Sequence, residues 1–171
     1  MSNHNYRLYS FVAGLYLNEL QKGLQTAHVI GDLAAQVVSA TPMAPEAIHA
    51  FRAWASTDKT IIILNALNHG GVVQLEGTLA GLATGLGLPC ATFREDEVSM
   101  NGMATAVGIV VPEKYYNAVP YYERLIVNGE WVQGKLEGWA YSDPDACESA
   151  VYALNTAEGQ LVSTLKNYRL A

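Results

Sequence analysis

The chain has 171 residues, half of them hydrophobic, which is enough for one domain with a core and excludes a disordered chain. Its formal charge is −6 with only ten Lys and Arg residues, which argues against broad nonspecific binding to nucleic acid. There is no apolar run of membrane-spanning length, no signal-peptide pattern, and no metal-ligand spacing around Cys90 or Cys147. We therefore expect a cytoplasmic protein with reduced thiols, no membrane association, no metal and no other cofactor.

The first part of the sequence predicts strands alternating with helices. Residues 8–13 are apolar and end at a glycine, which is typical of a buried strand, and Asn18 can cap a helix that runs to about Val38. Two prolines break that helix before a second one at 46–56. The β-branched run at 59–65 predicts a strand buried on both faces, as in a parallel sheet covered by helices.

The next segments continue the same alternation. A turn at 68–71 precedes a predicted helix at 72–86 and a strand at 90–94. An acidic loop at 95–97 then leads to a fourth strand at 105–111, which a proline stops. This order predicts a three-layer α/β/α domain over residues 1–114, with a mainly parallel, about four-stranded mixed sheet.

Residues 115–171 are predicted to form a C-terminal extension packed on that core. Asn128-Gly129 lies between two apolar runs and predicts a hairpin turn. Asp143-Pro144-Asp145 resembles a helix start, and residues 146–168 have a helical composition. We therefore expect this extension to contain a helix.

Polar side chains follow three of the predicted strands. In open α/β sheets, ligands bind beyond the carboxyl ends of the strands, which here would bring together residues 16–22, 65–71 and 94–101. Asn65 and Asn101 are candidate ligand-binding amides in these segments. The acidic residues of the third segment are equally consistent with a solvated turn.

The long first helix carries a polar stripe. Gln21, Gln25, His28 and Asp32 recur at helical spacing and lie along one face. The histidine could bind or protonate a ligand, with Asp32 one turn later able to raise its pKa. A packed or solvated polar face is the alternative interpretation.

Three segments together resemble the second class of peptidyl-tRNA hydrolases. Residues 22–28, Lys-Gly-Leu-Gln-Thr-Ala-His, are similar to that family's Gly-Lys-x-Ala-Ala-Gln-x-x-His-Ala helix. Residues 79–89, ending Gly-Leu-Pro, are similar to its next helix and turn. Residues 101–109, Asn-Gly-Met-Ala-Thr-Ala-Val-Gly-Ile, are similar to its Pro-Gly-Thr-x-Thr-x-x-Gly-Ile strand. The resemblance covers residues 7–114.

The resemblance implies hydrolysis of the ester between peptide and tRNA, without a metal. Gln25 and His28 fall on the family's helix positions, whereas its lysine falls on Gln21, with Lys22 one position later. Asp96 is the carboxylate nearest to the place of the family's aspartate.

The first functional hypothesis is therefore an esterase that acts on peptidyl-tRNA. Water would attack the ester carbonyl with Asp96 or His28 as general base, while Lys22 or Gln25 stabilises the oxyanion or binds phosphate. Gln21, Gln25, Asn65 and Asn101 would contact the substrate, and tRNA or peptidyl-tRNA would be the partner.

The second hypothesis is a noncatalytic binding protein on the same fold, with a protein or small-ligand partner. Its C-terminal third is rich in the aromatic residues that anchor interfaces, at 115–116, 121–122, 131 and 139. A homodimer is a further expectation for the chain.

Overall fold

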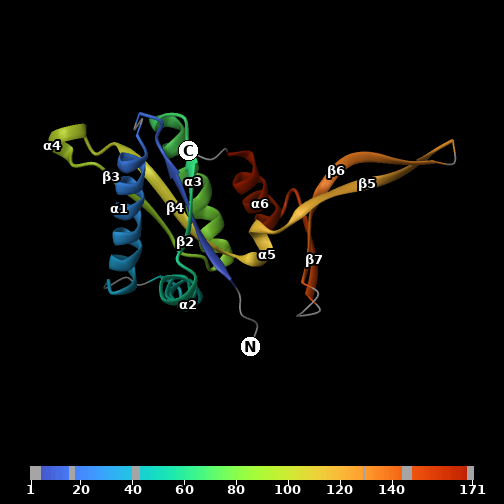
Figure 1. The fold of residues 1–171 in the computed structure, drawn as a ribbon, viewed down its shortest axis with the longest axis horizontal. Coiled ribbons are helices and arrows are strands. Elements are labelled where there is room, and N and C mark those ends of the chain that lie inside the picture. The colour runs from blue at the N-terminus through green and yellow to red at the C-terminus, as the bar shows by residue number, and fades with distance from the viewer. Residues whose placement is uncertain (1–4, 16–17, 40–42, 129, 144–147, 169–171) are drawn as a thin grey trace.

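The computed structural model describes residues 5–15, 18–39, 43–128, 130–143 and 148–168 (Figure 1). Its elements, in chain order, are β1 (Tyr6–Val12), α1 (Glu19–Val37), α2 (Pro45–Ala53), the π-helical turn η1 (Trp54–Asp58), β2 (Thr60–Asn65), α3 (His69–Leu86), β3 (Cys90–Arg94), α4 (Glu97–Met100), β4 (Ala104–Pro112), α5 (Glu113–Tyr116), β5 (Val119–Val127), β6 (Glu130–Asp143), β7 (Glu148–Ala153) and α6 (Ala157–Asn167). Within these residues, no helix is long and apolar enough to span a membrane.

The first sheet is mixed and has the strand order β2-β1-β4-β3. Only β1 and β2 pair in parallel, because α1 and α2 form the long crossover between them. β4 is antiparallel to both β1 and β3, since the short segment after β3 turns the chain directly back. The predicted α/β domain with a four-stranded mixed sheet is thus present, but its single parallel pair corrects the expectation of mainly parallel pairing.

Burial along the strands also differs from the expectation. β4 lies between two strands, and all nine of its residues are buried. β2 is an edge strand in which only Leu64 is buried and Ile61 is 40% exposed. The prediction that residues 59–65 are buried on both faces was therefore wrong, because a β-branched run favours a strand without fixing its place in the sheet.

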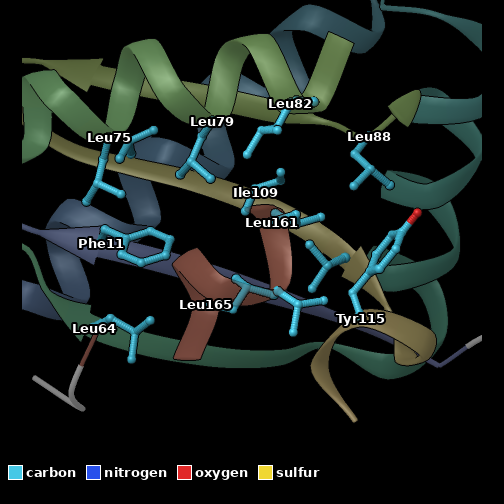
Figure 2. Close-up of a cluster of buried hydrophobic side chains, with 14 of the residues drawn as sticks. Phe11, Leu64, Leu75, Leu79, Leu82, Leu88, Ile109, Tyr115, Leu161 and Leu165 are labelled. Carbon is cyan, nitrogen blue, oxygen red and sulfur yellow. The ribbon is translucent and has the colours of Figure 1, made fainter. Parts of the chain in front are cut away.

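Helices cover both faces of this sheet. Leu8 and Val12 of β1 point into a cluster with α1 and α2, whereas Phe11 points into a cluster with α3 and α6. Figure 2 shows the second cluster, in which Leu161 of α6 and Leu79 of α3 lie around Phe11 and the sheet. The expected helix capped by Asn18 is confirmed, since its side chain accepts a hydrogen bond from the Gln21 backbone N–H at 2.8 Å.

α1 lies very close to the sheet at Gly108 in β4. A Cβ atom at this position would come within 2.6 Å of Val29 Cγ1 and 3.3 Å of Leu8 Cδ1. Glycine therefore sets the distance between helix and sheet here, which places the side chains of α1 against β3 and β4.

The C-terminal third forms a second, three-stranded antiparallel sheet, β5-β6-β7, and the helix α6. β5 and β6 meet at Asn128, which has φ of 55°, so the predicted hairpin is present, with Gly129 outside the described residues. Helical composition at 146–168 overstated the helix, because β7 occupies 148–153 and α6 begins only after the Thr156 cap. The predicted helix start includes Pro144 and Asp145, which lie outside the described residues.

The extension completes the core on the α3 side of the first sheet. Tyr115, Trp139, Tyr152 and Leu161 belong to the same buried cluster as Phe11. In Figure 1, α6 lies beside α3, while the β5–β6 hairpin projects away from both layers. Residues on both sides of position 114 therefore share one core.

Candidate functional site

The carboxyl ends of β1, β2 and β3 meet at one edge of the first sheet. Val12 is in register with Asn65 of β2 and Ala106 of β4, and Arg94 at the end of β3 is in register with Ala104. The described parts of the three polar segments expected at this edge, 18–22, 65–71 and 94–101, all follow these strand ends. Residues 16 and 17 of the first segment lie outside the described residues.

Gln25, Thr105 and Glu95 form a hydrogen-bonded cluster at this edge. Thr105 Oγ1 donates to Gln25 Oε1 at 2.8 Å, and Gln25 Nε2 donates to Glu95 Oε1 at 3.0 Å. Thr105 Oγ1 also lies 3.5 Å from Glu95 Oε1. The cluster thus connects α1, the start of β4 and the residue that follows β3.

Burial explains why these bonds are needed. Gln25 is 5% exposed and Thr105 is 0% exposed, and a buried amide or hydroxyl without a partner is costly. Both ends of the Gln25 amide are used, so its orientation is fixed. The Thr105 hydroxyl thereby orients the Gln25 amide, and the amide N–H of Gln25 holds one oxygen of the Glu95 carboxylate at this edge of the sheet.

His28 lies one helical turn after Gln25, on the exposed side of the same cluster. Its ring stacks on Phe93 of β3, with the ring centroids 4.3 Å apart and the planes 12° from parallel. Phe93 lies two residues before Glu95, just as His28 lies one helical turn from Gln25. Both side chains of α1 therefore contact the same end of β3 and the residue that follows it. Burial raises the pKa of Asp32, and the charge of His28 partly offsets that rise.

Gln21 and Lys22 lie near the start of the same helix. The Lys22 side chain is 13% exposed, and its Nζ forms an ion pair with Glu19 at 3.2 Å. Gln21 is exposed, and its backbone N–H is used by the Asn18 cap. The ion pair places the Lys22 ammonium at the first turn of α1, before Gln25 on the chain.

The remaining predicted residues stabilise turns. Asp96 Oδ1 accepts the Val98 backbone N–H at 2.6 Å, at the start of α4. Asn101 has φ of 52° at the end of α4, and Asn65 Oδ1 accepts the Leu67 backbone N–H at 2.8 Å. The carboxylate that contacts α1 in the Gln25 cluster is that of Glu95.

Sequence reasoning missed Glu95 and Thr105 as members of the site. Thr105 gave a signal, because it is the one polar side chain within an otherwise apolar strand, and such a hydroxyl needs a buried partner. The acidic run at 95–97 could not indicate which carboxylate turns inward. No family model matches this chain, and no curated protein matches it either.

A histidine on the other face of the sheet reaches the same edge. The His69 ring, at the start of α3, lies with Nδ1 3.0 Å from the Ala104 carbonyl oxygen. A carbonyl oxygen only accepts, so Nδ1 carries the hydrogen of this bond. His69 thus lies next to the strand residue that precedes Thr105.

Three pockets of the described structure lie away from the Gln25 cluster. One of about 530 Å³ lies on the β5–β6 hairpin, and two of about 430 Å³ lie near Pro112 and along β3. Their linings include none of the clustered residues Gln25, Glu95 and Thr105. Within the described residues, no group of three His, Cys, Asp or Glu side chains could hold a metal ion.

Proposed function

We propose that the protein is an ester hydrolase that acts on peptidyl-tRNA, with its site at the Gln25 cluster. The observation that carries the proposal is the hydrogen bond between Gln25 and Thr105, 80 residues apart on the chain. Each belongs to one of the segments that resemble the class 2 peptidyl-tRNA hydrolases. The contact supports the resemblance, because two weak motifs that meet at one site are more specific than either motif alone.

The proposed reaction is attack of water on the ester carbonyl. Glu95 takes the place that sequence reasoning gave to Asp96, since it is the carboxylate that the cluster orients against α1. As the water oxygen bonds to the carbonyl carbon, its proton passes to Glu95 or His28, and the bond to the ribose oxygen breaks. The same proton then returns to the leaving ribose oxygen.

Lys22 and Gln21 have binding roles in this proposal. The Lys22 ammonium lies at the start of α1, where the helix N-terminus also favours anions, and it would contact a phosphate near the ester. Gln21 is exposed beside it and would contact the nucleotide. Asn65 and Asn101 would contact the substrate through backbone groups, because their side chains and conformations serve the turns.

The test is release of peptide from a peptidyl-tRNA substrate by the purified full chain. Glu95→Gln keeps an oxygen that can accept the Gln25 hydrogen bond but removes the base, and we expect it to lower the rate on the order of 10²-fold or more. His28→Ala should also lower the rate. Glu46→Gln is the matched control, since Glu46 lies near Pro112 at the opposite edge of the sheet. Peptide release by the wild type that does not exceed the buffer rate would refute the proposal.

A noncatalytic binding protein on the same fold is the second candidate. One observation favours it: both ends of the Gln25 amide are bonded within the protein, to Thr105 and to Glu95. In that case the Gln25 cluster only stabilises the edge of the sheet. Wild-type protein that releases no peptide, yet retains a protein or small ligand in a pull-down that Glu95→Gln does not weaken, would favour this candidate.

A further inference from the structure

The most unusual surface of the molecule is the projecting hairpin. We call residues 119–128 and 130–138 the arm; they comprise β5 and most of the part of β6 that pairs with it. All described residues from Val119 to Gln133 are exposed, on both faces of the hairpin. A strand that covers a core shows alternating burial, so this uniform exposure means that none of the other described residues cover either face.

The exposed side chains of the arm are largely apolar. Ile126 is 66% exposed and Trp131 is 69% exposed, and these two residues are directly opposite each other in the ladder. Val119, Tyr121, Tyr122, Leu125, Val127 and Val132 are exposed as well. An isolated two-stranded hairpin is at best marginally stable in water, and an exposed apolar patch of this kind marks an interaction site.

The concave side of the arm has the composition of a protein interface. Tyr121, Tyr122 and Trp131 line a hollow of about 530 Å³, and the Arg124 guanidinium carbon lies 5.8 Å from the Trp131 ring centroid. Tyr, Trp and Arg are the residues that most often contribute strongly to binding between proteins. The outer edge of β5 is also open to a further strand, because β5 pairs only with β6.

We infer that the arm binds the arm of a second copy of this chain, forming a two-fold symmetric dimer. In such a dimer the same surface meets itself, so a surface of one charge sign would repel its copy. The arm carries three carboxylates, at 123, 130 and 137, and two cations, Arg124 and Lys135, and its net charge is only −1. The arm thus carries both signs of charge, with Glu123 next to Arg124, so carboxylates of one arm can lie against cations of the other in a two-fold arrangement.

The dimensions of the arm also suit a second arm. β5 has nine residues, which at about 3.3 Å per residue extend for about 30 Å. A second arm lying along the first has the same length, the same apolar content and the same open strand edge. Each arm would thereby cover the other, and no further surface of either copy is required.

The test is the mass of the full chain in solution, by light scattering or sedimentation over a roughly hundredfold range of concentration. We expect the wild type to form dimers that dissociate on dilution. Ile126→Asp and Trp131→Asp should give monomers over the same range, and both sites are already exposed, so folding should be unaffected. Val38→Asp is the matched control, because Val38 is 83% exposed outside the arm, and this variant should remain dimeric.

A charge variant tests the contribution of the arm's charges to the dimer. Lys135→Glu makes the arm strongly negative without removing apolar surface, so we expect weaker dimers at low salt that recover as salt screens the repulsion. A wild type that remains monomeric at every concentration would overturn the inference. It would do so even if the arm of that monomer were found to bind another protein. Arm variants that dissociate no more than Val38→Asp would also overturn it.

Discussion

At the scale of single residues, the Gln25 cluster combines a structural and a proposed catalytic role. Thr105 and Gln25 are almost fully buried, so their bond is part of the core as well as of the site. Removing either partner leaves the other unsatisfied, which costs more than the bond itself contributes. Stability and activity must therefore be measured together at these positions.

Thr105→Val removes the hydroxyl and keeps the shape of the side chain. We expect the free energy of unfolding to fall by about 1–3 kcal/mol, because Gln25 Oε1 loses its buried donor. Thr26→Val is a matched control, since Thr26 is equally buried and bonds Ser10 Oγ at 2.9 Å outside the cluster. Urea unfolding and peptide release should show that both variants lose stability but that only Thr105→Val loses activity. If the two variants released peptide at equal rates, the cluster would have no specific part in the reaction.

At the scale of elements, the distance between α1 and the sheet depends on Gly108. Any side chain there meets Val29 of the helix at 2.6 Å, so the helix must move or the side chain must strain. Since Gln25 and His28 belong to the same helix, this packing also sets how close they come to β3.

We expect Gly108→Ala to lower the free energy of unfolding by about 1–3 kcal/mol, measured by urea unfolding. The double variant with Val29→Ala should lose less than the sum of the two single variants, because the smaller residue makes room for the added methyl group. Gly23→Ala is the control: apart from its chain neighbours and the backbone of its own helix, no atom of the described residues lies within 4 Å of its added Cβ, and it should stabilise the helix by about 0.5–1 kcal/mol. Strict additivity at Gly108 and Val29 would contradict the packing argument.

Local signals predicted most elements, whereas the arrangement of strands depended on long-range contacts. The Asn18 cap and the Asn128 turn follow from neighbouring residues, so they could be predicted. The central place of β4 and the edge place of β2 depend on which strands pair, which local composition does not specify.

The candidate site shows the same division. Gln25 and His28 were predicted because helical spacing and a motif both indicated them. Glu95 was missed because three consecutive carboxylates look alike until the contact with α1 selects one of them. β7 was predicted as helix because its alanines favour helix, although pairing with β6 fixes it as a strand.

At the scale of the whole molecule, several ionisable groups are buried in their neutral forms. Burial raises the pKa of Cys90 to about 12 and that of Tyr115 to about 12. Burial also raises the pKa of Tyr116 to about 12, although the charge of Arg7 partly opposes this. Each group therefore binds its proton more tightly in the folded chain than in the unfolded chain.

The stability of the fold should consequently fall in alkaline solution. The unfolded chain loses these protons first, from its ordinary values of 9.0 for Cys and 10.0 for Tyr, so stability is retained below about pH 9 and lost toward pH 12. A buried tyrosine with this shift contributes at most roughly 3 kcal/mol. Urea midpoints across this pH window should decline, and Tyr115→Phe should decline less steeply. A midpoint that stays constant up to pH 12 would contradict the prediction.

The central position of β4 has a consequence for the order of folding during synthesis. β1 and β2 leave the ribosome early, but β4, which separates β1 from β3, is the last of the four strands to be made, after α3, β3 and α4. The apolar face against α3 also waits for Leu161 and Leu165, which arrive with α6. A nascent chain therefore exposes the β1–β2 pair until much later residues emerge, and this interval is when we expect it to depend most on chaperones.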